Sequence, residues 1–122
     1  MNTDEYLSAL EAKLRSIEGY VIAQAIEQEL DANIGIGYIR GSIVFFDGSR
    51  LEFTEQLPPN RRKYRIHLMN ADDQLLVRWD SAPHHQELST YPFHKHTMRG
   101  VEVYKAMTVL EALDEIISIL SF

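Results

Sequence analysis

Four of the chain's five histidines lie close together, in two pairs that each follow a proline. His84-His85 comes directly after one proline, and His94-Lys95-His96 begins two residues after another. Imidazoles with a pKa near about 6.5 can share acid and base roles close to neutral pH. Metal-free RNA cleavage needs such a pair to move protons and a cation to hold the charge of the phosphorane. The segment therefore predicts an acid–base site that acts on RNA.

The residues around the histidines supply the other parts of such a site. Arg78 would stabilise the developing charge, and Asp80 would orient one imidazole through its ring N–H. Tyrosine rings could stack on unpaired bases, and basic side chains could hold phosphates. The predicted catalytic set is His84, His85, His94, His96, Arg78 and Asp80. The predicted substrate contacts are Arg65, Tyr64, His67, Tyr91, Lys95 and Arg99, with further charge from Arg61, Arg62 and Lys63.

Backbone geometry limits which rings can meet. If residues 94–96 are extended, His94 and His96 point to one side and Lys95 to the other. Adjacent His84 and His85 cannot both face one point, so one of them would face the site while the other packs. Proline restricts its own backbone and that of the preceding residue, which pre-orders both pairs.

Two other interpretations compete with metal-free catalysis. We expect no cofactor, but His84, His94 and His96 could instead hold a divalent transition metal such as zinc, nickel or ferrous iron in a metal-dependent hydrolase. The spacing matches no specific metal motif, and there is no cysteine. The protein could also be a noncatalytic binder that inhibits a host target, with the histidines as a recognition surface. Packing alone explains the cluster poorly, because histidine is not a favoured core residue.

Length and composition set the frame for these residues. The chain has 122 residues, 45% of them apolar, and no cysteine, which predicts one domain over 1–122 that needs no disulfide. The N-terminus is acidic and no apolar run could span a bilayer, so we expect a cytoplasmic protein without a membrane partner. Net charge is −6, yet residues 61–105 carry eight Lys/Arg against five Asp/Glu. A basic face for RNA is therefore compatible with an acidic remainder.

The elements that must position the site follow from periodicity. Residues 3–17 predict an acidic helix with Thr3 as N-cap. Residues 20–33 are ambiguous between helix and a long or edge strand, and we favour the strand. Residues 34–46 are rich in β-branched and aromatic types, and Asp47-Gly48 predicts a hairpin turn into a return strand.

The second half adds strands at 62–69 and 74–80 and a helix at 108–120. In the first of these strands Tyr64 and Ile66 alternate with Arg65 and His67, so the two pairs face opposite sides. Thr108 begins a capping box for the final helix, whose apolar stripe could pack on the sheet or form a homodimer. The fold class is α+β: an antiparallel β-sheet of about five strands with an N-terminal and a C-terminal helix packed on one face.

Two quoted segments resemble a known family. Residues 62–96, RKYRIHLMNADDQLLVRWDSAPHHQELSTYPFHKH, and residues 45–55, FFDGSRLEFTE, are similar to the TumE family of toxin–antitoxin proteins. Arg78-Trp79-Asp80, Ala82-Pro83-His84-His85, Thr90, Pro92 and His94-Lys95-His96 match the family in order and spacing. Ser81, Tyr91 and Phe93 depart from it, standing where Asn, Phe and often His occur.

The resemblance implies a small toxin that a cognate antitoxin protein, encoded beside it, neutralises. Many small toxins of this kind cleave or modify RNA, so the expectation of a ribonuclease rests on analogy for the family and on the histidines for this chain. Because Phe93 replaces a histidine, the resemblance also implies that position 93 is not catalytic.

Overall fold

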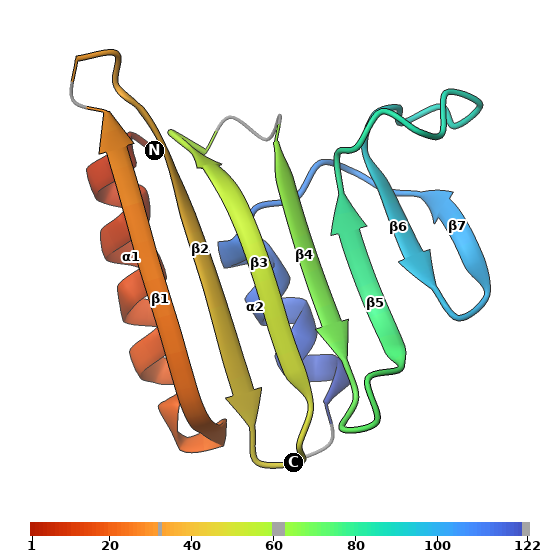
Figure 1. Cartoon of the computed structure of the whole chain (residues 1–122), viewed down its shortest axis with the longest axis horizontal. Coiled ribbons are helices and arrows are strands. Elements are labelled where there is room, and N and C mark those ends of the chain that lie inside the picture. Colours follow the sequence, from red (N-terminus) through yellow and green to blue (C-terminus); the bar gives the residue numbers. More distant parts are fainter. Residues whose placement is uncertain (32, 60–62, 121–122) are drawn as a thin grey trace.

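A computed structural model describes residues 1–31, 33–59 and 63–120 of the chain, which form one sheet backed by two helices (Figure 1). The helices are α1 (Thr3–Ser16) and α2 (Val109–Ile119), with a short 3-10 turn η1 (Glu18–Tyr20) after α1. The strands are β1 (Val21–Asp31), β2 (Ile36–Phe45), β3 (Arg50–Leu57), β4 (Tyr64–Met69), β5 (Leu75–Asp80), β6 (His94–Thr97) and β7 (Gly100–Val103).

The seven strands follow one another in chain order, and every neighbouring pair is antiparallel. Such a meander needs only tight turns between most strands. Gly48 has a φ of 85° in the β2–β3 turn, a left-handed conformation that glycine adopts without strain. The exception is the long connection between β5 and β6, which carries His84 and His85 out from the end of the sheet (Figure 1).

The core lies between the sheet and the helices, which both pack behind the strands in Figure 1. Alternate residues of the central strands point into it, as the burial of Leu51, Phe53, Glu55 and Leu57 along β3 illustrates. Trp79 of β5 is fully buried in this layer, as large aromatic residues at strand ends usually are. The opposite face of the sheet is not covered by either helix, and it is there that polar side chains can gather.

Side chains from distant elements satisfy the start of α2. The first backbone N–H groups of a helix have no partner within the helix. Here Val109 N donates to the Glu55 carboxylate at 3.2 Å, and Leu110 N donates to the Tyr6 hydroxyl at 3.2 Å. Glu111 N donates to the Thr108 hydroxyl at 3.1 Å, the predicted cap. Because Tyr6 also donates to Glu55, one buried network ties α1, β3 and α2 together.

The predicted α+β class, with both helices on one face, is confirmed, and two details differ. Asn2 caps α1 in place of Thr3, because its side chain accepts from Glu5 N while Glu5 reaches back to Asn2 N. The sheet has seven strands where about five were expected. The additional pair is the β6–β7 hairpin, whose four-residue strands are too short for periodicity to distinguish them from a loop.

Candidate active site

Six polar side chains form a block on the uncovered face of the sheet. Directly opposite residues of antiparallel strands point to the same face. Strands β4, β5 and β6 place Arg65, Asp80 and His94 in one row, and His67, Arg78 and His96 in the next. These six residues are called the polar block below. Because side chains two residues apart in a strand lie on the same face, residues from three strands that are separated in the sequence form one surface.

Asp80 is the centre of the block. Its side chain is only 7% exposed, and its two oxygens meet four donors or ring nitrogens. Oδ1 accepts from Ala82 N at 3.0 Å and lies 2.7 Å from Nε2 of His94. Oδ2 accepts from Nε of Arg78 at 3.1 Å and lies 3.6 Å from Nε2 of His96. A buried carboxylate requires such compensation, so Asp80 holds two histidines and a guanidinium in one place.

The hydrogen bonds of His94 define its protonation. Nδ1 lies 2.9 Å from the carbonyl oxygen of Pro92, which can only accept, so Nδ1 donates. Nε2 faces Asp80, and an ionised carboxylate also only accepts. With Asp80 ionised, His94 therefore carries two protons and a positive charge. The ring is 2% exposed, so its protons are not available to a substrate.

His96 is held in the neutral form. Partial burial, followed by the positive charge of Arg78, lowers the pKa of its imidazole below the usual 6.5, although Asp80 opposes the shift. Its ring centroid lies 4.8 Å from that of His94. A neutral imidazole beside two cations can accept a proton, which is the property of a general base.

Of the adjacent pair, His85 faces the site. Its ring centroid lies 4.9 Å from that of His94 and 5.6 Å from that of His96. His84 is exposed, so the expectation that the second histidine packs is wrong. The predicted metal set also changes: the ring nitrogens that converge within 4.8 Å belong to His85, His94 and His96, whereas His84 is outside the group.

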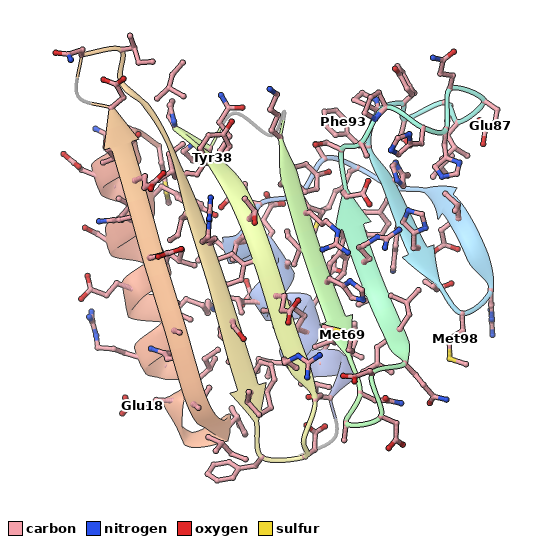
Figure 2. The ribbon with its side chains drawn as sticks, in the orientation of Figure 1. Glu18, Tyr38, Met69, Glu87, Phe93 and Met98 are labelled. Carbon is pink, nitrogen blue, oxygen red and sulfur yellow. The ribbon has the colours of Figure 1, made fainter. Side chains whose placement is uncertain are left out.

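Glu87 is a contact of the site that sequence reasoning missed. Its carboxylate lies 3.2 Å from Nδ1 of His85. A hydrogen bond from its own backbone, and then the His85 ring, lower the pKa of Glu87, so it is ionised at neutral pH. Figure 2 shows Glu87 on the β5–β6 connection beyond the end of the sheet. An acidic residue two positions after a histidine is too common a pattern to have singled it out.

Arg65 and His67 of β4 are the two members of the polar block that lie nearest the centre of the sheet. Nη2 of Arg65 lies 3.1 Å from Nδ1 of His67. A guanidinium only donates, so Nδ1 accepts and the ring proton of neutral His67 is on Nε2. Burial, and then the charges of Arg65 and Arg78, lower the pKa of His67. His67 therefore presents an N–H donor within a row of cations.

An open pocket of about 720 Å³ adjoins Asp80. Its lining is basic and aromatic and includes proline; among the lining residues are Lys63, Arg65, Arg78, His84, Tyr91 and Pro92. Tyr91 is 41% exposed and can offer its ring to a ligand. Tyr64 also lines the pocket, but it is 6% exposed and stacks on Phe93 at 6.1 Å. Its ring is therefore occupied by packing, which leaves base stacking to Tyr91.

The two remaining predicted contacts lie away from this pocket. Lys95 points to the opposite side of β6 from His94 and His96, as its alternation predicts, with Nζ 4.6 Å from the centroid of Tyr104 and 5.8 Å from that of Trp79. Arg99 is exposed in the β6–β7 turn. Arg61 and Arg62 fall outside the described residues. Lys95 and Arg99 thus have local explanations, cation–π contact and solvation.

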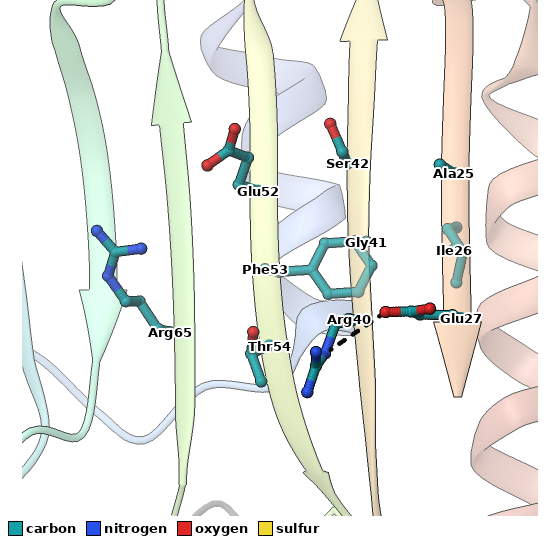
Figure 3. A pocket seen from close by; sticks show the side chains of 10 residues that line it. All are labelled: Ala25, Ile26, Glu27, Arg40, Gly41, Ser42, Glu52, Phe53, Thr54 and Arg65. Atoms are coloured by element: carbon teal, nitrogen blue, oxygen red, sulfur yellow. Dashed lines mark ion pairs between the residues drawn. The ribbon is translucent and has the colours of Figure 1, made fainter. Parts of the chain in front are cut away.

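A second hollow of about 640 Å³ lies over β1, β2 and β3 (Figure 3). Arg65 lines both hollows. The charges of the second hollow largely oppose one another, since Glu27 lies 3.8 Å from Arg40 and Glu52 is also present. No histidine lines it, whereas His84, Arg78 and Asp80 line the first pocket.

Comparison with known proteins gives one match. A family model described as Toxin TumE matches residues 10–121 of the chain, which include every residue of the polar block. No curated protein and no solved structure matches the chain significantly. Within the described residues, no helix is both long and apolar enough to cross a membrane.

Proposed function

The chain belongs to the TumE toxin family and is the toxin component of a toxin–antitoxin system; from this premise we propose that it acts by cleaving RNA at the polar block without a metal. The observation that carries the proposal is the convergence of His85, His94 and His96 beside Asp80. Neutral and charged imidazoles next to a guanidinium are the groups that RNA transesterification requires.

His96 is the general base in this proposal. As a neutral imidazole it takes the proton of a ribose 2′-hydroxyl, whose oxygen then attacks the adjacent phosphorus. Arg78 holds the negative charge that develops on the phosphorane oxygens, because its guanidinium is fixed by Asp80 at 3.1 Å. The products are a 2′,3′-cyclic phosphate and a 5′-hydroxyl.

His85 is the general acid that protonates the departing 5′-oxygen. Glu87 lies 3.2 Å from Nδ1 of its ring and orients the imidazole. Within the described residues Nε2 makes no hydrogen bond, so it remains for the leaving group. His94 cannot take this role, because its two nitrogens face Asp80 and Pro92. Asp80 and His94 are therefore positioning residues.

The basic pocket beside Asp80 supports single-stranded RNA as the substrate class. Lys63, Arg65 and Arg78 line it and would contact phosphates, and the exposed ring of Tyr91 would stack on a base. Base stacking is tolerant of sequence, so we expect weak base preference.

The adjacent histidines provide a matched test. His85→Ala and His96→Ala should each lower RNA cleavage by the folded protein by about 10²- to 10⁴-fold and abolish growth inhibition. His84→Ala changes a residue that lines the RNA pocket but lies outside the three convergent rings, so cleavage should stay within about tenfold. The measurement is cleavage of a labelled RNA, with detection of the cyclic phosphate and with circular dichroism to verify folding. Folded His96→Ala protein that remains fully toxic would remove the base from the proposal.

The second candidate is a divalent metal held by His85, His94 and His96. It is favoured because one ring nitrogen of each histidine lies within 4.8 Å of those of the other two. It requires Nε2 of His94 to leave Asp80, or Nδ1 to leave Pro92, which disfavours it. Metal content of the purified protein and cleavage with and without a chelator separate the two candidates. Activity that chelation abolishes and zinc restores would replace the metal-free mechanism.

A further inference from the structure

The outer edge of β1 is unusually open for the edge of a sheet. Within the described residues no strand pairs with its outer side, and it is eleven residues long. Exposed edges are normally blunted by lysine, proline or short length. The sequence of β1, VIAQAIEQELD, contains neither lysine nor proline, so an irregularity near Val21 and the acidic side chains are what limit pairing at this edge. The opposite edge, β7, has four residues.

A groove lies along this edge, between β1 and α1. Two adjoining hollows of about 390 and 290 Å³ share Glu11, Leu14 and Gln24. Ile22 and Ile26 of β1 supply apolar lining, and Ile22 is 57% exposed. A strand added to β1 would direct alternate side chains into this groove. The lining combines leucine and isoleucine side chains with Glu11, Arg15 and Gln24, so it fits side chains that are apolar or have an apolar stem.

The other side of the added strand would meet acidic residues. Glu27, Glu29 and Asp31 alternate along β1 on the uncovered face, and Glu18 adds a further negative charge on the groove side. Glu27 is paired with Arg40 at 3.8 Å, but Glu18 and Glu29 form no ion pair within the described part of the chain. Figure 2 labels Glu18 at this edge, at the opposite end of the sheet from Glu87. The edge therefore attracts positive charge.

We infer that the β1 edge binds the cognate antitoxin by strand addition, through an extended segment in which apolar and basic side chains alternate. Main-chain hydrogen bonds to β1 supply affinity, while the groove and the acidic row supply specificity. A second copy of this chain fits less well, because it would bring an equally acidic strand to the same edge. The inference depends on the antitoxin partner of the family and is independent of RNA cleavage.

Charge reversal tests the acidic contacts. The double variant E18K/E29K removes two exposed carboxylates without breaking an ion pair of the described residues, and D72K/E102K makes the same charge change at exposed positions remote from β1. Titration of the full chain with its antitoxin should show at least about tenfold weaker binding for E18K/E29K and an unchanged Kd for D72K/E102K. Equal weakening of both variants would reduce the effect to net charge and overturn the inference.

Hydrogen–deuterium exchange tests the strand pairing itself. Alternate amides of β1 face outward in the free chain, and adding the antitoxin should protect them while β7 amides are unchanged. Unchanged exchange in β1, or protection that appears in the free chain as its concentration rises, would exclude strand addition by the antitoxin. Neither assay uses RNA, so failure of the proposed ribonuclease activity would not affect the result.

Discussion

At the scale of single residues, Asp80 carries more interactions than any histidine of the site. It faces Arg78, His94 and His96, and it also accepts from Ala82 N. Taking a carboxylate and an imidazolium out of water costs several kcal/mol, and their contact and hydrogen bonds must offset that cost. A change at Asp80 should therefore affect stability and not only chemistry.

Asp80→Asn tests this dependence. The substitution keeps the shape but leaves the buried charge of His94 without its partner, so the free energy of unfolding should fall by about 3–5 kcal/mol. Urea denaturation measures the change. Asp72→Asn, at an exposed turn position, should alter it by less than about 0.5 kcal/mol. Equal stability of the Asp80→Asn protein and the parent would mean that His94 is neutral and that the pair shares its proton differently.

At the scale of elements, Glu55 links the sheet to both helices. It accepts from Tyr6 of α1 and from the first N–H of α2. Burial raises the pKa of Glu55 to about 7, against hydrogen bonds that favour the carboxylate. The charge of Glu55, a buried residue of β3, therefore changes in the physiological pH range. Its carboxylate contacts the first N–H of α2, so this change occurs at the start of that helix.

The pH dependence of stability follows from that shift. Between the ordinary value of 4.5 and about 7, the folded protein keeps the Glu55 proton while the unfolded chain loses it. The stability that this proton contributes is fully present below pH 4.5 and is lost as pH rises to about 7, with a slope of at most about 1.4 kcal/mol per pH unit.

Glu55→Gln should remove this component, and the difference between the two stability curves isolates it from other titrating groups. Denaturation at a series of pH values measures both curves. Glu29→Gln, at an exposed position of β1, serves as the control and should leave the curve unchanged. A constant difference between the Glu55→Gln protein and the parent from pH 4.5 to 7 would show that Glu55 is ionised in the folded state throughout.

At the scale of the whole molecule, the sheet separates two kinds of surface. The polar block and its basic pocket lie on β4, β5 and β6, whereas the acidic edge is β1, at the other end of the meander (Figure 1). The net charge of −6 therefore averages over two regions of opposite sign. Such separation directs an anionic ligand to one end and a basic partner to the other.

The affinity for RNA should consequently fall only modestly as the salt concentration rises, because few basic residues line the pocket. Lys63, Arg65 and Arg78 line the pocket, and three phosphate contacts to a single strand predict a slope of log K against log salt of about −2. Arg65→Gln should reduce the slope to about −1.4. Fluorescence anisotropy with a labelled oligonucleotide on the inactive His96→Ala protein measures it. A slope near zero would remove phosphate recognition from this pocket.

Local sequence patterns predicted most of the fold. Alternation predicted β4, a strand was also expected at 74–80 where β5 lies, the Asp47-Gly48 turn joined β2 to β3, and Thr108 marked the start of α2. These features depend on residues close in the chain, which is why they can be read without coordinates. The β6–β7 hairpin was not predicted, because a four-residue strand is too short to show a clear alternation of apolar and polar residues. Pairing with β5 holds the hairpin in place.

The sequence by itself determined that histidines would be concentrated near Arg78 and Asp80, and that His94 and His96 would share a side if extended. Only the tertiary structure decided that His85 joins them, that His84 is exposed, and that both nitrogens of His94 are occupied. The reason is physical: strand register sets which rows meet across the sheet. Register depends on contacts between segments far apart in the chain, which no local pattern specifies.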